Sequence, residues 1–552
     1  MADNLSKLSG RKGLEDNLFE NLVGAIGPAG ASPGALKQLA DDYHLGEAIP
    51  FGTASFYDFL RRDHLDKKVV VCNGSSCLCA GTQDDLVGKL TGKLNRDEIG
   101  EICCLGRCHE NRAFQYQGQN YSGDAIEQLD AILDGNASVH VDRYHVQSTM
   151  DPPMLTAPFS GVANYYSLLD EFLQQPSKIA LEEVKTSGLR GRGGAGFPLG
   201  LKWDSCRVEN SAEKYIVCNA DEGDPGAYID RYLLEEQPHS VLFGILVAGY
   251  CVGAESGVLY IRAEYPRAQE AVATAIREIE EAGYAGQSIQ GSKLNFTFKV
   301  VNGAGAYICG EETSLLASIE GRRPEVSVRP PYPTVEGLYG KPTVVNNVES
   351  LACIHDILSI GGDAFARIGT EKSTGPKLAS LDSAFNRPGI YEVPMGTPLQ
   401  VLVEELGQGF SRPTKAIQVG GPLGGIVPCT KIGELTFDFE SFQNAGFLLG
   451  HAGIIGIPEE MPMIEYMKHL LHFCAVESCG KCFPCRLGSV RGEEMLGHAI
   501  NGTAKLDRGL LDDLLETLEL GSLCGLGGGI PLPIRNVLEH FAEELSPHFA
   551  GN

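Results

Sequence analysis

The chain has 552 residues, of which 43% are hydrophobic, so it is long enough for several globular domains and is neither disordered nor fibrous. Its formal net charge of -26 argues against nucleic acid as a partner, because a phosphate-binding surface requires a basic excess. The longest apolar stretch, residues 241–254, contains two glycines and is shorter than the roughly 20 residues that span a bilayer, so no transmembrane helix is expected.

The sequence contains 17 cysteines, and their meaning depends on the compartment. The N-terminus is polar and charged, without the apolar stretch of a secretory signal, so we expect a cytoplasmic location. Disulfides are reduced there. The cysteines therefore indicate metal ligands together with buried thiols.

The N-terminal part is predicted to be helical and then mixed. Apolar residues such as Leu36 and Leu39 recur at helical spacing between residues 14 and 62. A buried strand is predicted over residues 67–72, and residues 124–133 are predicted to be helical. Helices followed by strand, loop, strand and helix favour a small α+β sandwich of the thioredoxin type.

Four cysteines in this part have the spacing of an iron–sulfur site. They are Cys72, Cys77, Cys104 and Cys108. A C-x4-C pair with a later C-x3-C pair suits a 2Fe-2S cluster, which needs two thiolates per iron. Zinc or scattered core cysteines are the alternatives, and the neighbouring Cys79 or Cys103 could replace a ligand.

A glycine-rich loop, residues 189–198, follows a predicted helix over residues 179–186. The pattern G-x-G-x-x-G is matched by Gly191, Gly193 and Gly196. The Rossmann fingerprint follows a strand, so we interpret the loop instead as backbone amides able to hold a phosphate. Lys202 lies just beyond and could pair with a phosphate or be a solvated helix lysine.

Acidic and amide residues occur in short groups further along. The predicted strand over residues 215–218 ends in a loop with three acids, which could bind ribose hydroxyls or form an exposed acidic turn. These acids are Asp221, Glu222 and Asp224. A second glycine-rich loop, residues 303–312, ends in two glutamates, and Asn346 and Asn347 are adjacent amides able to recognise a heterocycle or phosphate.

The last part of the chain carries a second set of cysteines. Residues 389–456 are predicted to be β-rich, with no chemistry that we identify, and helical spacing dominates from Pro462. The cysteines within this helical part are Cys479, Cys482, Cys485 and Cys524. A C-x2-C-x2-C loop with a distant fourth thiolate is typical of a 4Fe-4S cluster, whereas zinc sites usually have two C-x2-C pairs.

Five motifs occur in one order and resemble a known family. They are the glycine loop at 188–198, Cys-Asn-Ala-Asp-Glu-Gly-Asp-Pro-Gly at 218–226, Gly-Ala-Tyr-Ile-Cys-Gly-Glu-Glu-Thr at 305–313, Asn-Asn-Val-Glu at 346–349 and the cysteine loop at 477–486. The chain resembles, over residues 160–545, the flavin-containing NADH-oxidising subunit of respiratory complex I and its soluble relatives. In front of it, residues 15–135 resemble a fused copy of the 24-kDa 2Fe-2S subunit.

The resemblance implies specific cofactor ligands. FMN would be lined by Gly191, Gly193, Gly194, Lys202, Asn219, Asp221, Tyr307, Gly310, Glu311, Asn346 and Asn347. NADH would be faced by Phe197, Glu222, Asp224 and Glu312. The charge of Glu312 would disfavour the extra phosphate of NADPH, so NAD is expected rather than NADP.

Some positions depart from the complex I pattern. Asp224 replaces Glu, Arg329 replaces Lys, Tyr332 replaces Phe, and Ser205 stands where a second Phe is expected. The motifs at 420–424, 450–454 and 485–492 look most like the β subunit of NAD-dependent molybdenum or tungsten formate dehydrogenases. The resemblance implies a large metal- and iron–sulfur-containing catalytic subunit as partner, with a bidirectional NiFe hydrogenase or complex I as alternatives.

The expected activity is hydride exchange between NAD and FMN, coupled to single-electron transfer through the 4Fe-4S cluster to the partner, with no side-chain acid or base. A zinc-binding scaffold is the non-enzyme alternative. We expect a multidomain α/β and α+β protein: an N-terminal helical segment (1–62), a thioredoxin-like 2Fe-2S domain (63–135), a linker (136–160), an FMN- and NADH-binding domain without the usual dinucleotide fingerprint context (161–385), a β-grasp-like domain (386–456) and a helical 4Fe-4S domain (457–552).

Overall fold

The computed structural model describes residues 13–26, 32–136, 140 and 142–550, so parts of the predicted N-terminal helices and linker lie outside the described residues. The first helices and turns are α1 (Leu18–Ala25), α2 (Pro33–Asp42), α3 (Ala48–Ala54), η2 (Asp58–Leu60) and α4 (Arg62–Leu65). Helix α2 lies within the segment predicted to be helical; Pro33 is in its first turn and the Ser32 side chain accepts the Ala35 amide. Apolar side chains of α1 share a core with Val217 and Val258 of a sheet far along the chain.

The predicted α+β sandwich follows the N-terminal helices. Its strands are β1 (Val69–Cys72), β2 (Ile99–Ile102), β3 (Phe114–Tyr116) and β4 (Gln119–Tyr121). Its helices and turns are α5 (Ser75–Ala80), α6 (Gln83–Thr91), η3 (Arg96–Glu98), η4 (Gly123–Gln128) and α7 (Leu129–Leu133). The sheet order is β2-β1-β3-β4, with only β1 and β2 parallel.

A parallel sheet forms the centre of the largest domain. Its strands are β6 (Tyr215–Ala220), β7 (Ser256–Ile261), β8 (Thr297–Asn302) and β9 (Thr343–Asn347), in the order β8-β7-β6-β9. The surrounding helices and turns are α8 (Val162–Leu173), α9 (Lys178–Thr186), α10 (Leu199–Arg207), α11 (Ile229–Glu236), α12 (Pro238–Val252), α13 (Pro266–Glu281), η5 (Ile289–Gly291), η6 (Tyr307–Gly310), α14 (Glu312–Ile319), η7 (Leu338–Gly340), α15 (Val348–Ala352), α16 (Ile354–Ile360) and α17 (Gly362–Ala366). Ile216 and Cys218 pack on the side of α12, while Val217 packs on the side of α1, as alternation along a strand requires.

A mixed six-stranded sheet accounts for the β-rich part, in the order β13-β12-β14-β10-β11-β5. Its strands are β5 (His145–Ser148), β10 (Pro376–Leu381), β11 (Gly389–Pro394), β12 (Thr414–Val419), β13 (Gly425–Pro428) and β14 (Gly453–Pro458). The helical elements beside it are η8 (Val401–Leu406), η9 (Cys429–Glu434) and α18 (Phe439–Asn444). Two strands lie outside the predicted limits of this part. Strand β5 falls in the predicted linker, and it was not predicted because it is short and partly exposed. Strand β10 precedes residue 386, and it was not predicted because it contains a buried lysine, Lys377.

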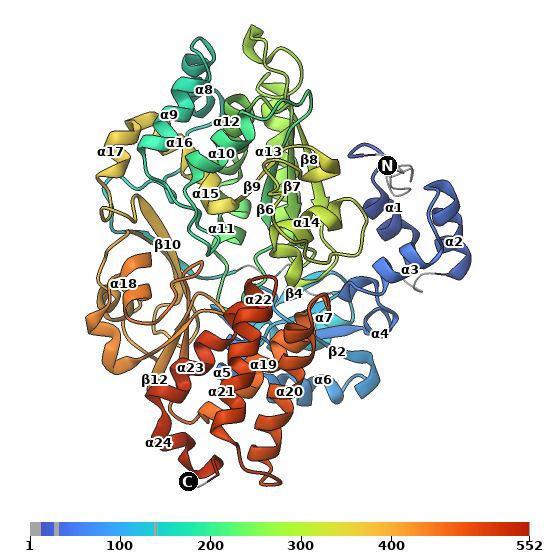
Figure 1. Ribbon diagram of the computed structural model, residues 1–552, viewed down its shortest axis with the longest axis vertical. Coiled ribbons are helices and arrows are strands. Elements are labelled where there is room, and N and C mark those ends of the chain that lie inside the picture. The colour runs from blue at the N-terminus through green and yellow to red at the C-terminus, as the bar shows by residue number, and fades with distance from the viewer. Residues whose placement is uncertain (1–12, 27–31, 137–139, 141, 551–552) are drawn as a thin grey trace.

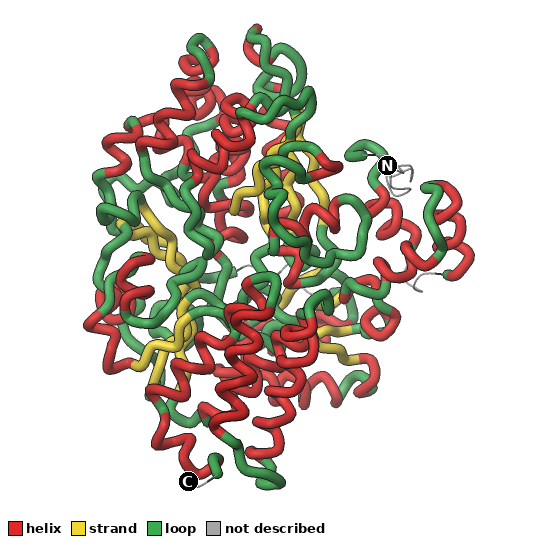
Figure 2. Tube along the Cα trace, in the orientation of Figure 1, coloured by secondary structure: helices red, strands yellow, loops and turns green. Residues whose placement is uncertain are grey.

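Six helices and a final turn complete the chain. They are α19 (Met463–Glu477), α20 (Phe483–Ile500), α21 (Arg508–Gly521), α22 (Gly525–Gly529), α23 (Pro531–His540), α24 (Ala542–Leu545) and η10 (Ser546–His548). Figure 1 shows these red helices below the parallel sheet, with the orange mixed sheet to the left and the blue N-terminal helices to the right. Figure 2 shows helices around each group of strands. Among the described residues, no helix has both the length and the apolar character needed to cross a membrane.

Candidate cofactor-binding site

The carboxyl ends of β6 and β9 meet at the point where the strand order reverses, and we call the region beyond these ends the crevice. Strand β6 pairs with β7 on one side and with β9 on the other, and Asn219 is opposite Asn347. Ligands of open α/β sheets bind at such a switch point. The Asn346 side chain accepts the Trp203 indole N–H at 2.7 Å, and the Asn219 amide donates to the Gly310 carbonyl at 2.7 Å. The structure thus brings together predicted ligands from the ends of β6 and β9 and from the turn η6.

The glycine-rich loop lies against this crevice. It is closed by the Gly191 amide, which donates to the Phe197 carbonyl at 2.9 Å. A Cβ added to Gly193 would lie 3.0 Å from the Cβ of Asn347, and Gly194 has a φ of +111°, so the loop requires glycine there. It follows helix α9 and precedes α10, in agreement with the prediction that it is not a Rossmann turn.

The acidic loop after β6 contains carboxylates with different surroundings. Glu222 is buried, and its two oxygens accept the Asp230 and Arg231 amides at 2.9 and 3.1 Å, so it caps the start of α11. Its predicted contact with NADH stays a prediction. Asp221 differs, because its Oδ2 is buried without a hydrogen-bond partner among the described residues. Burial raises the pKa of Asp221 well above its usual value, which favours the neutral carboxyl.

The two glutamates after β8 also have different contacts. The Glu311 carboxylate accepts the amides of Thr313 and Ser314 at 2.9 and 3.0 Å and caps α14. Glu312 forms ion pairs with Arg329 at 2.6 Å and with Lys202 at 3.5 Å. Its charge is therefore shared with two cations, which the sequence did not reveal.

Two aromatic rings near these loops are exposed. The Phe197 side chain belongs to the glycine-rich loop and is 53% exposed, and Tyr332 is 56% exposed. Exposed rings of this kind offer flat apolar surfaces for a heterocycle. Their predicted stacking on NADH is untested.

One residue beside the crevice was missed by sequence reasoning. His451 Nε2 lies 3.1 Å from Asp224 Oδ2, and the Tyr307 hydroxyl donates to Asp224 Oδ1 at 2.7 Å. A Cβ on Gly194 would lie 3.9 Å from the Gly450 backbone, so His451 adjoins the glycine-rich loop. The sequence signal was the motif at 450–454, to which the resemblance gave no role at the cofactors.

The first four predicted thiol ligands converge between β1, α5 and the loop after β2. All four are buried, and the Cys104 and Cys108 sulfurs are 3.6 Å apart. Contact with Cys104 and burial raise the pKa of the Cys108 thiol well above its usual value. A cluster of buried thiols is compatible with a metal site, because a bound metal would stabilise the thiolates, and the ligand assignment stays a prediction. Cys79 belongs to a different core cluster, so the four predicted ligands fit better than a set that contains Cys79.

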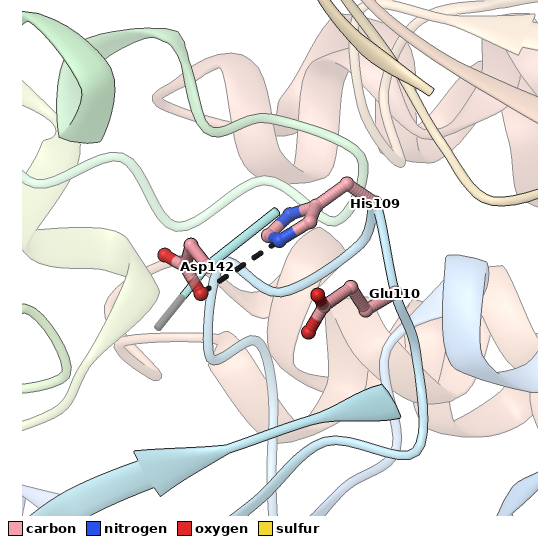
Figure 3. Close-up of side chains that lie close together, drawn as sticks. All are labelled: His109, Glu110 and Asp142. Carbon is pink, nitrogen blue, oxygen red and sulfur yellow. Dashed lines mark ion pairs between the residues drawn. The ribbon is translucent and has the colours of Figure 1, made fainter. Parts of the chain in front are cut away.

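A charged cluster lies beside this thiol site, as Figure 3 shows for His109, Glu110 and Asp142. His109 Nε2 is 3.8 Å from Asp142 Oδ1. Asp142 also forms ion pairs with Arg107 and, at 2.6 Å, with Arg231. Two guanidinium groups already neutralise this carboxylate and repel a further cation, so we interpret the cluster as a buried ion-pair network.

The second set of thiols lies among the C-terminal helices. Cys479 follows α19, Cys482 and Cys485 lie at the start of α20, and Cys524 lies at the start of α22. A Cβ on Gly527 would lie 2.6 Å from the Cβ of Cys485, which brings α22 against α20. A hydrogen bond from Cys474 lowers the pKa of Cys485 to about 7. A pocket of about 470 Å³ opens beside Cys479.

The fold and the two thiol sites define a nucleotide-cofactor and iron–sulfur protein. The profile of the Nuo51 FMN-binding domain matches residues 184–356, and that of the NADH-ubiquinone oxidoreductase-F iron-sulfur binding region matches residues 465–548. The F 2 subunit of NADH-quinone oxidoreductase from Rhizobium meliloti is 42% identical, over 67% of this chain and 88% of that protein. The HndC subunit of the NADP-reducing hydrogenase from Solidesulfovibrio fructosivorans is 41% identical, over 71% of this chain and 80% of that protein.

The crystal structure of an NAD+-reducing NiFe-hydrogenase in the H2-reduced state has a TM-score of 0.85, with 28% identity, and covers 97% of this chain and 93% of that chain. The present chain belongs to the family of the NADH-binding F subunits of NADH-quinone oxidoreductase. Membership confirms the prediction of FMN, NAD and a 4Fe-4S cluster as cofactors. The 2Fe-2S cluster and the individual ligands stay predictions.

Proposed function

We propose that this chain is the NAD(H)-binding subunit of a larger oxidoreductase and exchanges single electrons with a partner subunit through the 4Fe-4S site. One observation carries the proposal: loops of one crevice contact a thiol of the first site and the helix that leads to the second site. The Gly226 amide, after β6, donates to Cys108 Sγ at 3.2 Å, and the Tyr307 amide, after β8, donates to Glu477 Oε2 at 3.0 Å. Glu477 ends the helix that precedes Cys479.

FMN fits the crevice by its donor set. The unpaired Asp221 oxygen offers a carboxyl, and the close approach of Gly193 to Asn347 leaves backbone rather than side chain at the surface of the loop. When bound, FMN supplies the hydride acceptor and the conversion between two-electron and one-electron transfer. The residues that we propose to hold it are Gly191, Gly193, Gly194, Lys202, Asn219, Asp221, Tyr307, Gly310, Glu311, Asn346 and Asn347.

NAD is proposed to bind beside FMN, against Phe197, Asp224 and Glu312. We propose NAD rather than NADP because the Glu312 carboxylate would repel an additional phosphate. The Arg329 and Lys202 ion pairs weaken that repulsion, so the selectivity depends on how firmly they hold Glu312.

The first thiol site is proposed to hold the 2Fe-2S cluster as a side store of one electron. The burial of all four thiols supports this assignment, because buried thiolates need the positive charge of a bound metal to be stable. The cytoplasm is part of the proposal, since no disulfide joins cysteines in the described part of the chain.

A partner surface is supported by exposed apolar side chains near the second thiol site. They are Val476, Phe483, Leu487, Val490, Leu520 and Leu523. Apolar side chains grouped on a surface mark interaction sites. We propose that the occupant is the molybdenum- or tungsten- and iron–sulfur-containing subunit of an NAD-dependent formate dehydrogenase, on the resemblance of residues 420–424, 450–454 and 485–492.

A NiFe-hydrogenase partner is the second candidate, and the likeness over 97% of this chain to the NAD+-reducing hydrogenase structure favours it. The test is purification of the native complex, followed by metal analysis and flavin absorbance. Molybdenum or tungsten supports formate dehydrogenase, nickel supports hydrogenase, and quinone reduction without these metals supports complex I. A colourless zinc protein without flavin would overturn the proposed function itself.

A further inference from the structure

The mixed sheet reaches the cofactor crevice through its loops after β12 and before β14. Gly421 follows β12, and a Cβ there would lie 2.6 Å from Asp224 Oδ1. His451 precedes β14 and contacts the other oxygen of the same carboxylate. The loop after β12 and the loop before β14 therefore meet at Asp224, although no functional residue was identified from the sequence of this part of the chain.

The ring of His451 is fixed by its own backbone. Its Nδ1 accepts the Gly453 amide at 3.1 Å, which places the ring proton on Nε2. Protonation of the ring would retain that proton. Nε2 thus carries a proton in either charge state, at 3.1 Å from Asp224 Oδ2, although the contact is an ion-pair distance and not an aligned hydrogen bond.

Asp224 is consequently contacted by a hydroxyl donor and by an imidazole, which come from different parts of the chain. The Tyr307 hydroxyl comes from the loop after β8 and His451 from the mixed sheet. The other charged groups nearby are engaged elsewhere: the Glu222 oxygens accept the α11 amides, and Lys377 forms an ion pair with Glu349 at 2.5 Å. Asp224 is 22% exposed and His451 is 12% exposed, so the carboxylate remains reachable while its partner is largely covered.

We propose that His451 is a positioning residue that holds the Asp224 carboxylate, together with Tyr307, toward the nicotinamide site. Donors to an ionised carboxylate favour its charged form. That charge attracts the positive nicotinamide ring of NAD+ and does not attract a neutral reduced ring. The inference rests on the proposed NAD and FMN site and adds a residue that selects between the oxidised and reduced nucleotide.

The test measures binding rather than turnover. Oxidised holoprotein is titrated calorimetrically with NAD+ and with tetrahydro-NAD, whose ring is neutral and which cannot donate hydride. His451→Ala is expected to weaken NAD+ binding by about tenfold and the neutral analogue by less than about twofold. His451→Gln keeps an N–H donor and should restore NAD+ binding to within about threefold. His498→Gln, at an exposed position on α20, is the matched control and should change neither ligand.

An unchanged NAD+ affinity in His451→Ala, or an equal loss for both ligands, would overturn the inference. If that variant fails to retain FMN, Asp224→Asn keeps the side-chain shape and must reproduce the selective loss of NAD+ binding. An unchanged ratio of the NAD+ affinity to the tetrahydro-NAD affinity in Asp224→Asn would equally refute the inference. Failure of the unaltered protein to bind FMN or NAD+ would instead refute the proposed function.

Discussion

Replacing Glu312 by Gln is expected to raise the use of NADPH while changing the use of NADH little. The Glu312 carboxylate is 20% exposed and forms ion pairs with Arg329 at 2.6 Å and with Lys202 at 3.5 Å. A phosphate near this carboxylate meets a negative charge that the two cations only partly offset. The substitution removes that charge and frees both cations to attract the phosphate.

The size of the effect follows from the exposure of these groups. Two unit charges 4 Å apart interact by about 1 kcal/mol in water and about 4 kcal/mol at a protein surface. The Arg329 and Lys202 side chains are 33% and 25% exposed, so the net repulsion lies toward the lower of these values. A net effect of about 1.4 kcal/mol corresponds to roughly a tenfold gain in kcat/KM for NADPH.

The assay is reduction of an artificial acceptor, with kcat/KM measured for NADPH and NADH at low and high salt. Arg329→Gln is the matched control with the opposite sign, because it exposes the charge of Glu312 and should lower NADPH use several-fold. High salt should reduce both effects. Equal changes for the two nucleotides in Glu312→Gln, or a gain in NADPH use with Arg329→Gln, would refute the electrostatic explanation.

Four further outcomes are expected. Cys482→Ala should leave FMN bound and reducible by NADH while electron exchange with the partner stops, and normal NAD-linked turnover of the complex would refute the relay role. Cys104→Ser should remove a 2Fe-2S signal from the electron paramagnetic resonance spectrum and keep the 4Fe-4S signal. A spectrum in which both signals persist would contradict the first thiol site. Phe483 is 75% exposed, and Phe483→Asp should weaken partner binding by about tenfold or more with flavin reduction unchanged, whereas an unaltered affinity would argue against this surface. Lys377 and Glu349 are a buried ion pair at 2.5 Å, so Lys377→Met should lower the free energy of urea unfolding by about 3–5 kcal/mol. The double variant Lys377→Met with Glu349→Leu should recover most of this loss, and a double variant as unstable as the single one would show that the unpaired charge is not the cause.

The sequence predicted the parts of the site that depend on local pattern. Asn346 and Asn347 were predicted as adjacent amides able to bind a ligand, and in the structure they end β9, whose parallel pairing with β6 brings Asn347 opposite Asn219. The cysteine spacings likewise predicted two thiol sites, and the helix before the glycine-rich loop excluded a Rossmann turn. In each case a short run of residues determines the local element, and the usual arrangement of parallel strands places the ends of these elements at one edge of the sheet.

The missed features depend on contacts between distant segments. His451 and Asp224 are separated by more than 200 residues, and nothing in the spacing of either loop indicates that they meet. Lys377 lies in a strand that is buried throughout, where a lysine normally argues against a buried position. Its partner, Glu349, follows a strand of another sheet, so only the assembled fold explains why the charge is tolerated.

The glycines of the cofactor loops have a second role that concerns the spacing of the domains. Gly226 has a φ of +97°, and a Cβ there would lie 2.7 Å from Ile455 of the mixed sheet, while its amide contacts Cys108. Gly305 has a φ of +82°, and a Cβ there would lie 2.7 Å from Phe59 in the N-terminal part of the chain. Backbone therefore packs directly against three other parts of the molecule at the edge of the parallel sheet. Because main-chain contacts leave little freedom for side-chain rearrangement, they fix the separation between the crevice and the first thiol site, and electron exchange with the proposed 2Fe-2S side store would depend on that separation.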